Sequence, residues 1–74
     1  MGDVLTREDK DVFKNIYNMA VMYWNPNGTD EYWNGLLERQ RILANNPLGE
    51  KLSRAIVSFL TVKYEREVKP YETT

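Results

Sequence analysis

Cysteine and histidine are both absent from this chain of 74 residues. Without cysteine, the protein has no disulfide bond, no thiolate zinc site and no thiol nucleophile. Without histidine, it lacks the commonest general base and the commonest transition-metal ligand. We therefore expect no catalytic residue, no bound cofactor and no metal site.

The remaining polar residues offer no substitute for the missing groups. Glu31 and Glu38 lie seven positions apart, about 10 Å along a helix axis, which exceeds the separation of a retaining-glycosidase pair. Ser53 and Ser58 lack a lysine three residues later that would activate them. The chain also has no glycine-rich phosphate loop. We expect a protein that is not an enzyme.

Long apolar runs and a strong charge of either sign are missing as well. The longest stretch interrupted only by hydroxyl groups, Ala55 to Val62, is far shorter than the ~20 residues that span a bilayer. The first residues are acidic and polar, whereas a secretory signal begins with basic residues and an apolar stretch. Ten basic and eleven acidic residues give a net charge of −1, which attracts the chain to neither nucleic acid nor membrane. We expect a cytoplasmic protein that makes no membrane contact.

Helix start signals occur three times along the chain. Thr6 and Thr29 are suitable N-caps, and Asn46 is followed by a proline at the first helical position. Pro26 interrupts the chain after the first apolar stretch, and Pro70 does so near the end. These signals predict three helices and short loops.

The predicted helices cover about 7–24, 30–44 and 47–68. The Asn34-Gly35 pair leads us to expect a loosely held first turn in the second helix, because glycine costs about 1 kcal/mol relative to alanine there. The expected fold is all-α: a compact three-helix bundle that forms a single domain over 1–74. We expect short disordered ends at about 1–5 and 70–74.

Apolar residues recur at helical spacing in each predicted helix. The expected core positions of the first helix are Phe13, Ile16, Tyr17, Ala20, Val21 and Trp24. Those of the second are Trp33, Leu36, Leu37, Gln40, Leu43 and Ala44. The expected inward face of the third comprises Leu48, Leu52, Ala55, Ile56, Phe59 and Lys63.

Seven further apolar positions exceed what one inward stripe per helix requires. They are Val12, Met19, Met22, Tyr23, Ile42, Val57 and Val62. Three interpretations remain open: these residues form an interface between two copies, widen the core of a monomer, or are incidentally exposed. The small size favours self-association, because a core of this length is marginal and gains from covering another apolar face.

Four aromatic residues bracket the first loop: Tyr23, Trp24, Tyr32 and Trp33. One interpretation is that both tryptophans cap the core while the tyrosines cover the loop. Another is a surface where aromatic anchors hold a protein partner. Adjacent helical positions cannot both face inward, so at least one ring of each pair should lie near the surface.

Charge is unevenly distributed along the chain. Residues 1–31 carry a net charge of −3, and residues 39–69 carry +4. A tight turn at Asn45-Asn46-Pro47 gives this basic region the outline of a helix-turn-helix, in which Arg41, Lys51, Arg54 and Lys63 would contact DNA. The chain lacks the high positive charge of such domains, which makes nucleic-acid binding the less favoured alternative.

Three segments carry a resemblance: Phe13-x-x-Ile16-Tyr17, Tyr32-Trp33, and Leu48-Gly49-Glu50-Lys51-Leu52-x-x-Ala55-Ile56-x-x-Phe59-Leu60. In their order and aromatic placement they resemble a group of short helical proteins from phages and other mobile elements of low-GC Gram-positive bacteria. The resemblance covers most of residues 11–67. It implies a helical fold and a mobile-element setting, and it transfers no functional residue.

These features together favour a small non-enzymatic helical protein. We expect an interaction or accessory module that binds another protein or forms a homo-oligomer. The alternative is a small DNA-associated regulator that uses residues 39–69.

Overall fold

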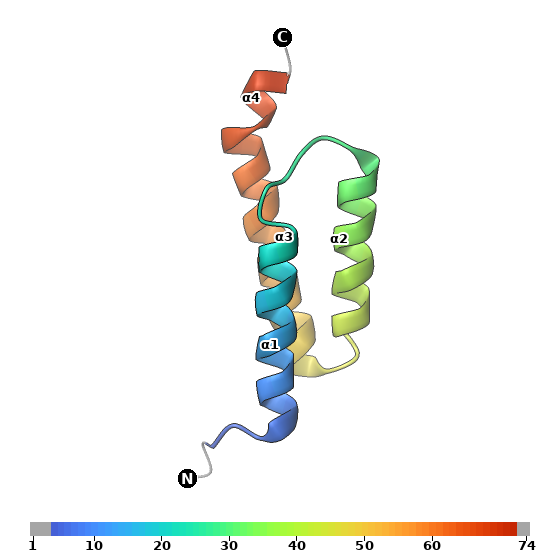
Figure 1. Ribbon diagram of the computed structural model, residues 1–74, viewed down its shortest axis with the longest axis vertical. Coiled ribbons are helices and arrows are strands. Elements are labelled where there is room, and N and C mark those ends of the chain that lie inside the picture. Colours follow the sequence, from blue (N-terminus) through green and yellow to red (C-terminus); the bar gives the residue numbers. More distant parts are fainter. Residues whose placement is uncertain (1–3, 73–74) are drawn as a thin grey trace.

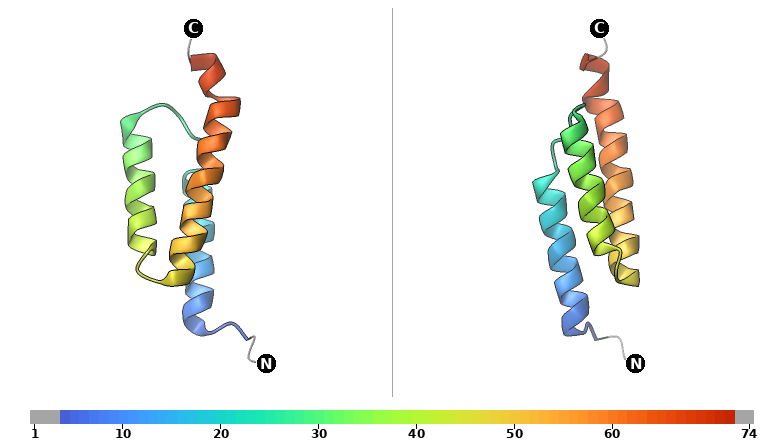
Figure 2. Two further views of the ribbon diagram at one scale, coloured as in Figure 1. Left: turned by 180° about the vertical axis from the view of Figure 1, so that it is seen from behind. Right: turned by 90° about the vertical axis from the view of Figure 1, so that its right-hand side faces the viewer.

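The computed structural model describes residues 4–72 and consists of helices joined by short loops (Figure 1). The elements are α1 (Arg7–Met22), α2 (Asp30–Leu43), α3 (Pro47–Glu67) and a short α4 (Lys69–Glu72). The chain runs up through α1, down through α2 and up again through α3, so α1 and α3 are parallel (Figures 1 and 2). Among the described residues there is no strand. The predicted three-helix all-α fold is confirmed.

The three predicted N-caps are present. The Thr6 hydroxyl accepts a bond from the Asp9 amide (3.0 Å), and the Asp9 carboxylate accepts one from the Thr6 amide (3.2 Å), which completes a capping box. The Thr29 hydroxyl accepts from the Tyr32 amide at 3.2 Å. The Asn46 side chain accepts from the amides of Leu48 (2.9 Å) and Gly49 (3.1 Å). These bonds satisfy amides that have no partner within the helix.

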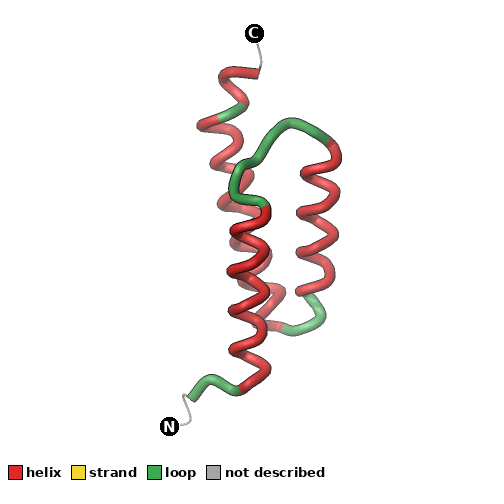
Figure 3. Tube along the Cα trace, in the orientation of Figure 1, coloured by secondary structure: helices red, strands yellow, loops and turns green. Residues whose placement is uncertain are grey.

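The helix ends differ from the predicted ones by one or two residues. α1 ends at Met22 rather than at residue 24, because Tyr23 leaves helical geometry (φ −111°, ψ 23°) ahead of Pro26. α3 ends at Glu67 with Val68 as its C-cap. The predicted disordered C-terminal end is instead helical through α4, as Figure 3 shows. Residues 4–6 have no regular structure, and the rest of the predicted disordered ends, 1–3 and 73–74, lies outside the described residues.

The core differs from the predicted one mainly in the rotation of α1. Its buried apolar side chains are Val12, Ile16, Met19, Leu36, Leu43 and Leu60. Only Ile16 of the predicted α1 stripe is buried, while Phe13, Tyr17, Val21 and Trp24 are exposed. α1 carries two overlapping apolar stripes, and it packs on α3 with the stripe that contains Val12, Ile16 and Met19. The predicted core stripe of α1 was therefore wrong.

α2 and α3 also bury only part of their predicted faces. Leu36 and Leu43 are buried as predicted, but Leu37 is exposed. In α3 the buried positions are Gly49, Ser53 and Leu60, whereas the predicted core residues Ala55 and Phe59 are exposed. Small residues lie where α3 approaches α2, which lets the two helices pack closely. The fully buried Ser53 hydroxyl donates to the Glu50 carbonyl (3.2 Å) and accepts from the Gln40 side-chain amide (3.4 Å).

The two helical glycines have specific neighbours. A Cβ at Gly35 would lie 2.8 Å from the Tyr23 hydroxyl, so glycine makes room for the Tyr23 ring. The Tyr23 side chain thus packs against the first turns of α2. A Cβ at Gly49 would overlap the backbone carbonyl of Leu43. Glycine at position 49 is thus required by the close approach of the α2 end to the start of α3.

Substitution at these glycines tests that packing. We expect Gly49→Ala to lower the free energy of unfolding by about 2 kcal/mol, because a backbone carbonyl cannot move aside without displacing the helix end. Gly35→Ala should change it by less than about 1 kcal/mol, since the gain in helix propensity offsets a small shift of the Tyr23 ring. Urea unfolding followed by tryptophan fluorescence measures both. Equal losses for the two variants would contradict this account.

Candidate functional site

The most distinctive surface of the protein is apolar and lies on α1 and α3. We define the α1/α3 face as Phe13, Tyr17, Val21, Trp24, Ala55, Phe59 and Val62. Its six large side chains are between 43% and 68% exposed. They follow helical spacing, with α1 contributing positions 13, 17, 21 and 24 and α3 contributing 55, 59 and 62. α1 and α3 pack directly against each other, so these positions form one surface.

Aromatic and cationic contacts join the two halves of this face. The rings of Trp24 and Phe59 stack with their centroids 5.5 Å apart and an interplanar angle of 27°. The Lys63 ammonium lies 4.1 Å from the centroid of the Trp24 ring, within the range of a cation–π interaction. The same ammonium donates to the Trp24 carbonyl oxygen at 2.6 Å. Trp24 is therefore held in place by α3, although nearly half of it is exposed.

The end of α1 is bonded to both other helices. The Tyr32 hydroxyl from α2 donates to the Tyr23 carbonyl at 2.6 Å, next to the carbonyl that Lys63 of α3 binds. Carbonyls at a helix C-terminus lack partners within the helix, and side-chain donors satisfy them. These two bonds anchor the chain at the end of α1, and they accompany the rotation that buries Val12, Ile16 and Met19.

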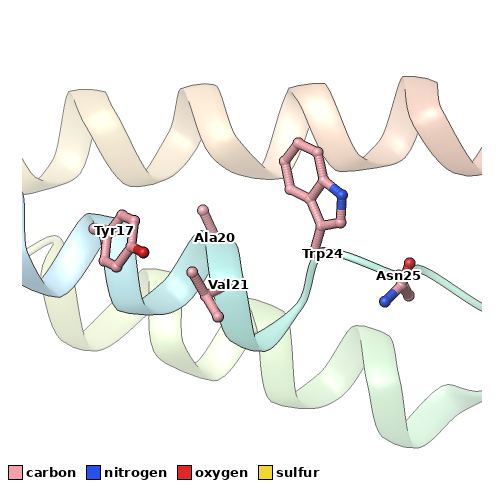
Figure 4. A pocket seen from close by; sticks show the side chains of 5 residues that line it. All are labelled: Tyr17, Ala20, Val21, Trp24 and Asn25. Carbon is pink, nitrogen blue, oxygen red and sulfur yellow. The ribbon is translucent and has the colours of Figure 1, made fainter.

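A shallow depression lies within the α1/α3 face. Tyr17, Ala20, Val21, Trp24 and Asn25 line it, and its volume is about 550 Å³ (Figure 4). The Trp24 ring points toward α3 and forms one wall (Figure 4). A second depression of about 380 Å³ lies on α2, between Leu37 and the ion pair of Arg41 with Glu38. The first is lined mainly by apolar side chains, whereas the second is largely polar.

The four aromatic residues proposed as an interaction surface divide into two groups of contacts. Tyr23 and Tyr32 meet edge to face (5.4 Å), as do Tyr32 and Trp33 (4.7 Å) and Trp33 and Tyr64 (5.4 Å). Tyr23, Tyr32 and Trp33 are half-buried against the core and cap it. Trp24 alone turns away from them, onto Phe59.

The four basic residues proposed for DNA contact are also not gathered on one surface. Arg41 pairs with Glu38 on α2, and Arg54 pairs with Glu50 at 2.8 Å on α3. Arg54 and Lys63 are nine positions apart, which is two and a half helical turns, so they lie on opposite sides of α3. Lys51 is exposed near the start of α3. Arg54 and Lys63 therefore cannot both contact one surface of DNA from α3.

The sequence interpretation missed most of the α1/α3 face by assigning its residues to the core. The signal that would have found it is the width of the apolar arc of α1. Besides the predicted stripe, Val12, Met19 and Tyr23 are apolar, and two neighbouring helices cannot cover so wide an arc. Of the seven surplus positions, Val12 and Met19 are buried and only Met22, Ile42 and Val62 are exposed.

Within residues 4–72, no group of three or more acidic side chains is placed to hold a metal ion. No helix in that range has the length and apolarity needed to cross a membrane. No family model, curated protein or solved structure matches the chain significantly.

The buried phenol of Tyr32 makes the aromatic cap sensitive to alkaline pH. Burial raises the pKa of Tyr32 above its ordinary value, and the nearby Tyr23 adds a further electrostatic increase. The folded state thus holds this proton more tightly than the unfolded state does. The resulting stability is fully present below about pH 10 and is lost as pH rises through the raised pKa.

We expect Tyr32→Phe to lower the free energy of unfolding by about 1 kcal/mol at pH 7, because the bond to the Tyr23 carbonyl is lost. Between about pH 9 and pH 11 the wild-type protein should lose more stability than this variant, since only the wild type carries the shifted phenol. Urea unfolding at several pH values measures both. Tyr17→Phe, which removes an exposed hydroxyl, should keep wild-type stability at pH 7. Parallel pH profiles for wild type and Tyr32→Phe would contradict the assignment.

Proposed function

We propose that this protein is a non-enzymatic interaction module that binds a protein partner through the α1/α3 face. The observation that carries the proposal is an aromatic surface, continuous over two helices, that the fold leaves exposed. Soluble proteins rarely expose a large contiguous apolar patch unless it is a binding site. Tryptophan, which Trp24 supplies here, is among the residues that dominate binding energy at protein interfaces.

The rigidity of the surface supports the same proposal. Trp24 is fixed by Phe59 and Lys63, and the remaining members of the face stand on regular helix. Binding to a preorganised surface requires little additional ordering of side chains, so more of the contact energy appears as affinity. Tyr17 and Val21, the most exposed members of the face, are the natural contact residues.

The biological setting proposed for this module is that of a phage or other mobile element. Support comes from the resemblance carried by the segments around Phe13, Tyr32 and Leu48. We propose a cytoplasmic location on the same basis.

The alternative, a small DNA-associated regulator, has less support. Two of its four basic residues, Arg41 and Arg54, form ion pairs with neighbouring glutamates. α2 and α3 pack side by side and antiparallel (Figures 1 and 2), whereas the helices of a helix-turn-helix cross at about 90–120°. Neither feature suits recognition of a DNA groove by the 39–69 region.

Site-specific photo-cross-linking in living bacteria tests the proposed function. A benzophenone amino acid replaces Tyr17 in one variant and Ile42 in a matched control, since Ile42 is exposed on α2 outside the face. We expect protein adducts at position 17, identified by mass spectrometry, and few at position 42. Adducts should also disappear when Val21→Lys is added to the position 17 variant. Equal labelling at both positions, or none at position 17, would overturn the proposal.

A further inference from the structure

We infer that the partner of the α1/α3 face is a second copy of this chain, in a two-fold symmetric dimer. This inference rests on the proposed function and deepens it by naming the occupant. Three observations support it: the excess surface of the isolated chain, the elongated shape of the bundle, and the self-complementary form of the face.

The accessible surface of one chain is larger than a compact monomer requires. It measures 5612 Å², whereas a compact monomer of 8.7 kDa exposes about 4,700 Å². Part of the excess of about 900 Å² belongs to residues 4–6 and to α4, which extend beyond the other helices at the two ends of the molecule (Figure 1). The excess nevertheless compares well with the ~800 Å² that each partner covers in a stable interface of standard size.

The α1/α3 face contributes much of this area. Its four aromatic side chains expose about 400 Å² between them, if a whole aromatic side chain presents ~200 Å². Val21, Val62 and Ala55 add to it. The face is therefore large enough to form the apolar centre of a standard interface, with a polar rim around it. A small molecule would leave most of it uncovered.

The elongated shape of the chain also supports a dimer. Its extents are 54 × 21 × 16 Å, so the bundle is long and thin. The radius of gyration is 14.2 Å, against about 11 Å for a compact domain of this length. α1 and α2 make few contacts with each other because α3 is the central helix. A second copy on the outer side of α1 and α3 would convert this thin arrangement into a two-layered one.

The face also offers both parts of a self-complementary contact. Trp24, which lines the depression, stacks on the half-exposed Phe59 ring, so each copy presents a hollow next to exposed aromatic side chains. In a two-fold dimer the same patch serves on both sides, and each hollow faces the partner's projecting residues. The apolar stretch from Phe13 to Trp24 is about 17 Å long, and a second copy matches this length by construction.

The charges around the face give the dimer a distinctive salt dependence. Lys10 precedes Phe13 by three positions, Lys51 precedes Ala55 by four, and Arg66 follows Val62 by four, which places these exposed cations at the rim. Lys63 adds a cation beside Trp24. Asp9, four positions before Phe13, and Glu65, three after Val62, offset two of these charges, so the rim of each copy is net positive and salt screens the repulsion between the two rims. Salt should therefore strengthen this dimer, whereas it weakens binding to an acidic partner or to DNA.

Sedimentation equilibrium of the full chain tests the inference, from about 1 μM to about 1 mM protein and at low and high salt. Val21→Lys is compared with Ile42→Lys. The two sites are matched: both are β-branched, lie in the last turn of a helix, and are 60% and 54% exposed. Circular dichroism confirms that each variant is folded. Tyr17→Lys provides a second disruption of the face.

We expect a wild-type dimer whose dissociation constant falls severalfold as salt rises. Val21→Lys and Tyr17→Lys should raise that constant about tenfold or more, and Ile42→Lys should change it less than about twofold. A wild-type chain that stays monomeric throughout, or equal effects of Val21→Lys and Ile42→Lys, overturns the inference. A dimer that dissociates at high salt also overturns the inference.

The proposed function can survive such a result. If the chain is monomeric but the cross-linker at position 17 still labels a different protein in cells, only the identity of the occupant was wrong. If position 17 labels no protein at all, the interaction module itself is refuted. A monomer that sediments with a short DNA duplex at low salt and is released at high salt overturns the dimer and supports the regulator instead.

Discussion

The rotation of α1 about its own axis is the constraint on which the other features depend. Two carbonyls at the end of this helix are bound by donors from different elements: Tyr32 of α2 binds that of Tyr23, and Lys63 of α3 binds that of Trp24. Since α1 has apolar residues on adjacent stripes, either stripe could have formed the core. In the structure the stripe of Val12, Ile16 and Met19 is buried, the two bonds hold the end of α1 in that orientation, and the neighbouring stripe is left outside.

The central position of α3 explains why this outer stripe is not covered within one copy. Both α1 and α2 pack mainly on α3 and much less on each other. The side of α3 toward α2 requires close packing at Ser53 and Gly49, which fixes α2 on that side. Within residues 4–72, no other helix covers α1 and the adjoining side of α3. Exposure of Phe59 and Tyr17 therefore follows from the packing of α2 against α3, not from a local defect.

The sequence was sufficient to predict the number of helices, their N-caps and their approximate ends, because Thr6, Thr29, Asn46 and the prolines act locally. It was insufficient for the helix rotations. The stripes of Ile16 and Tyr17 differ by one residue, or about 100° around the helix, and hydrophobic periodicity alone cannot choose between them. That choice depends on contacts between distant residues, such as Lys63 with Trp24 and Tyr23 with Gly35. For the same reason, Trp24 was selected as a candidate while its neighbours on the face were assigned to the core.

The distribution of hydrogen-bonded groups and exposed apolar area supports the proposed binding role. Over the described residues, every buried polar side-chain atom has a hydrogen-bond partner, and Ser53 is bonded on both sides. Tyr32, whose pKa is raised by burial, already uses its hydroxyl in a structural bond to the Tyr23 carbonyl. The fold leaves apolar side chains of α1 and α3 exposed, and covering that apolar area is favourable.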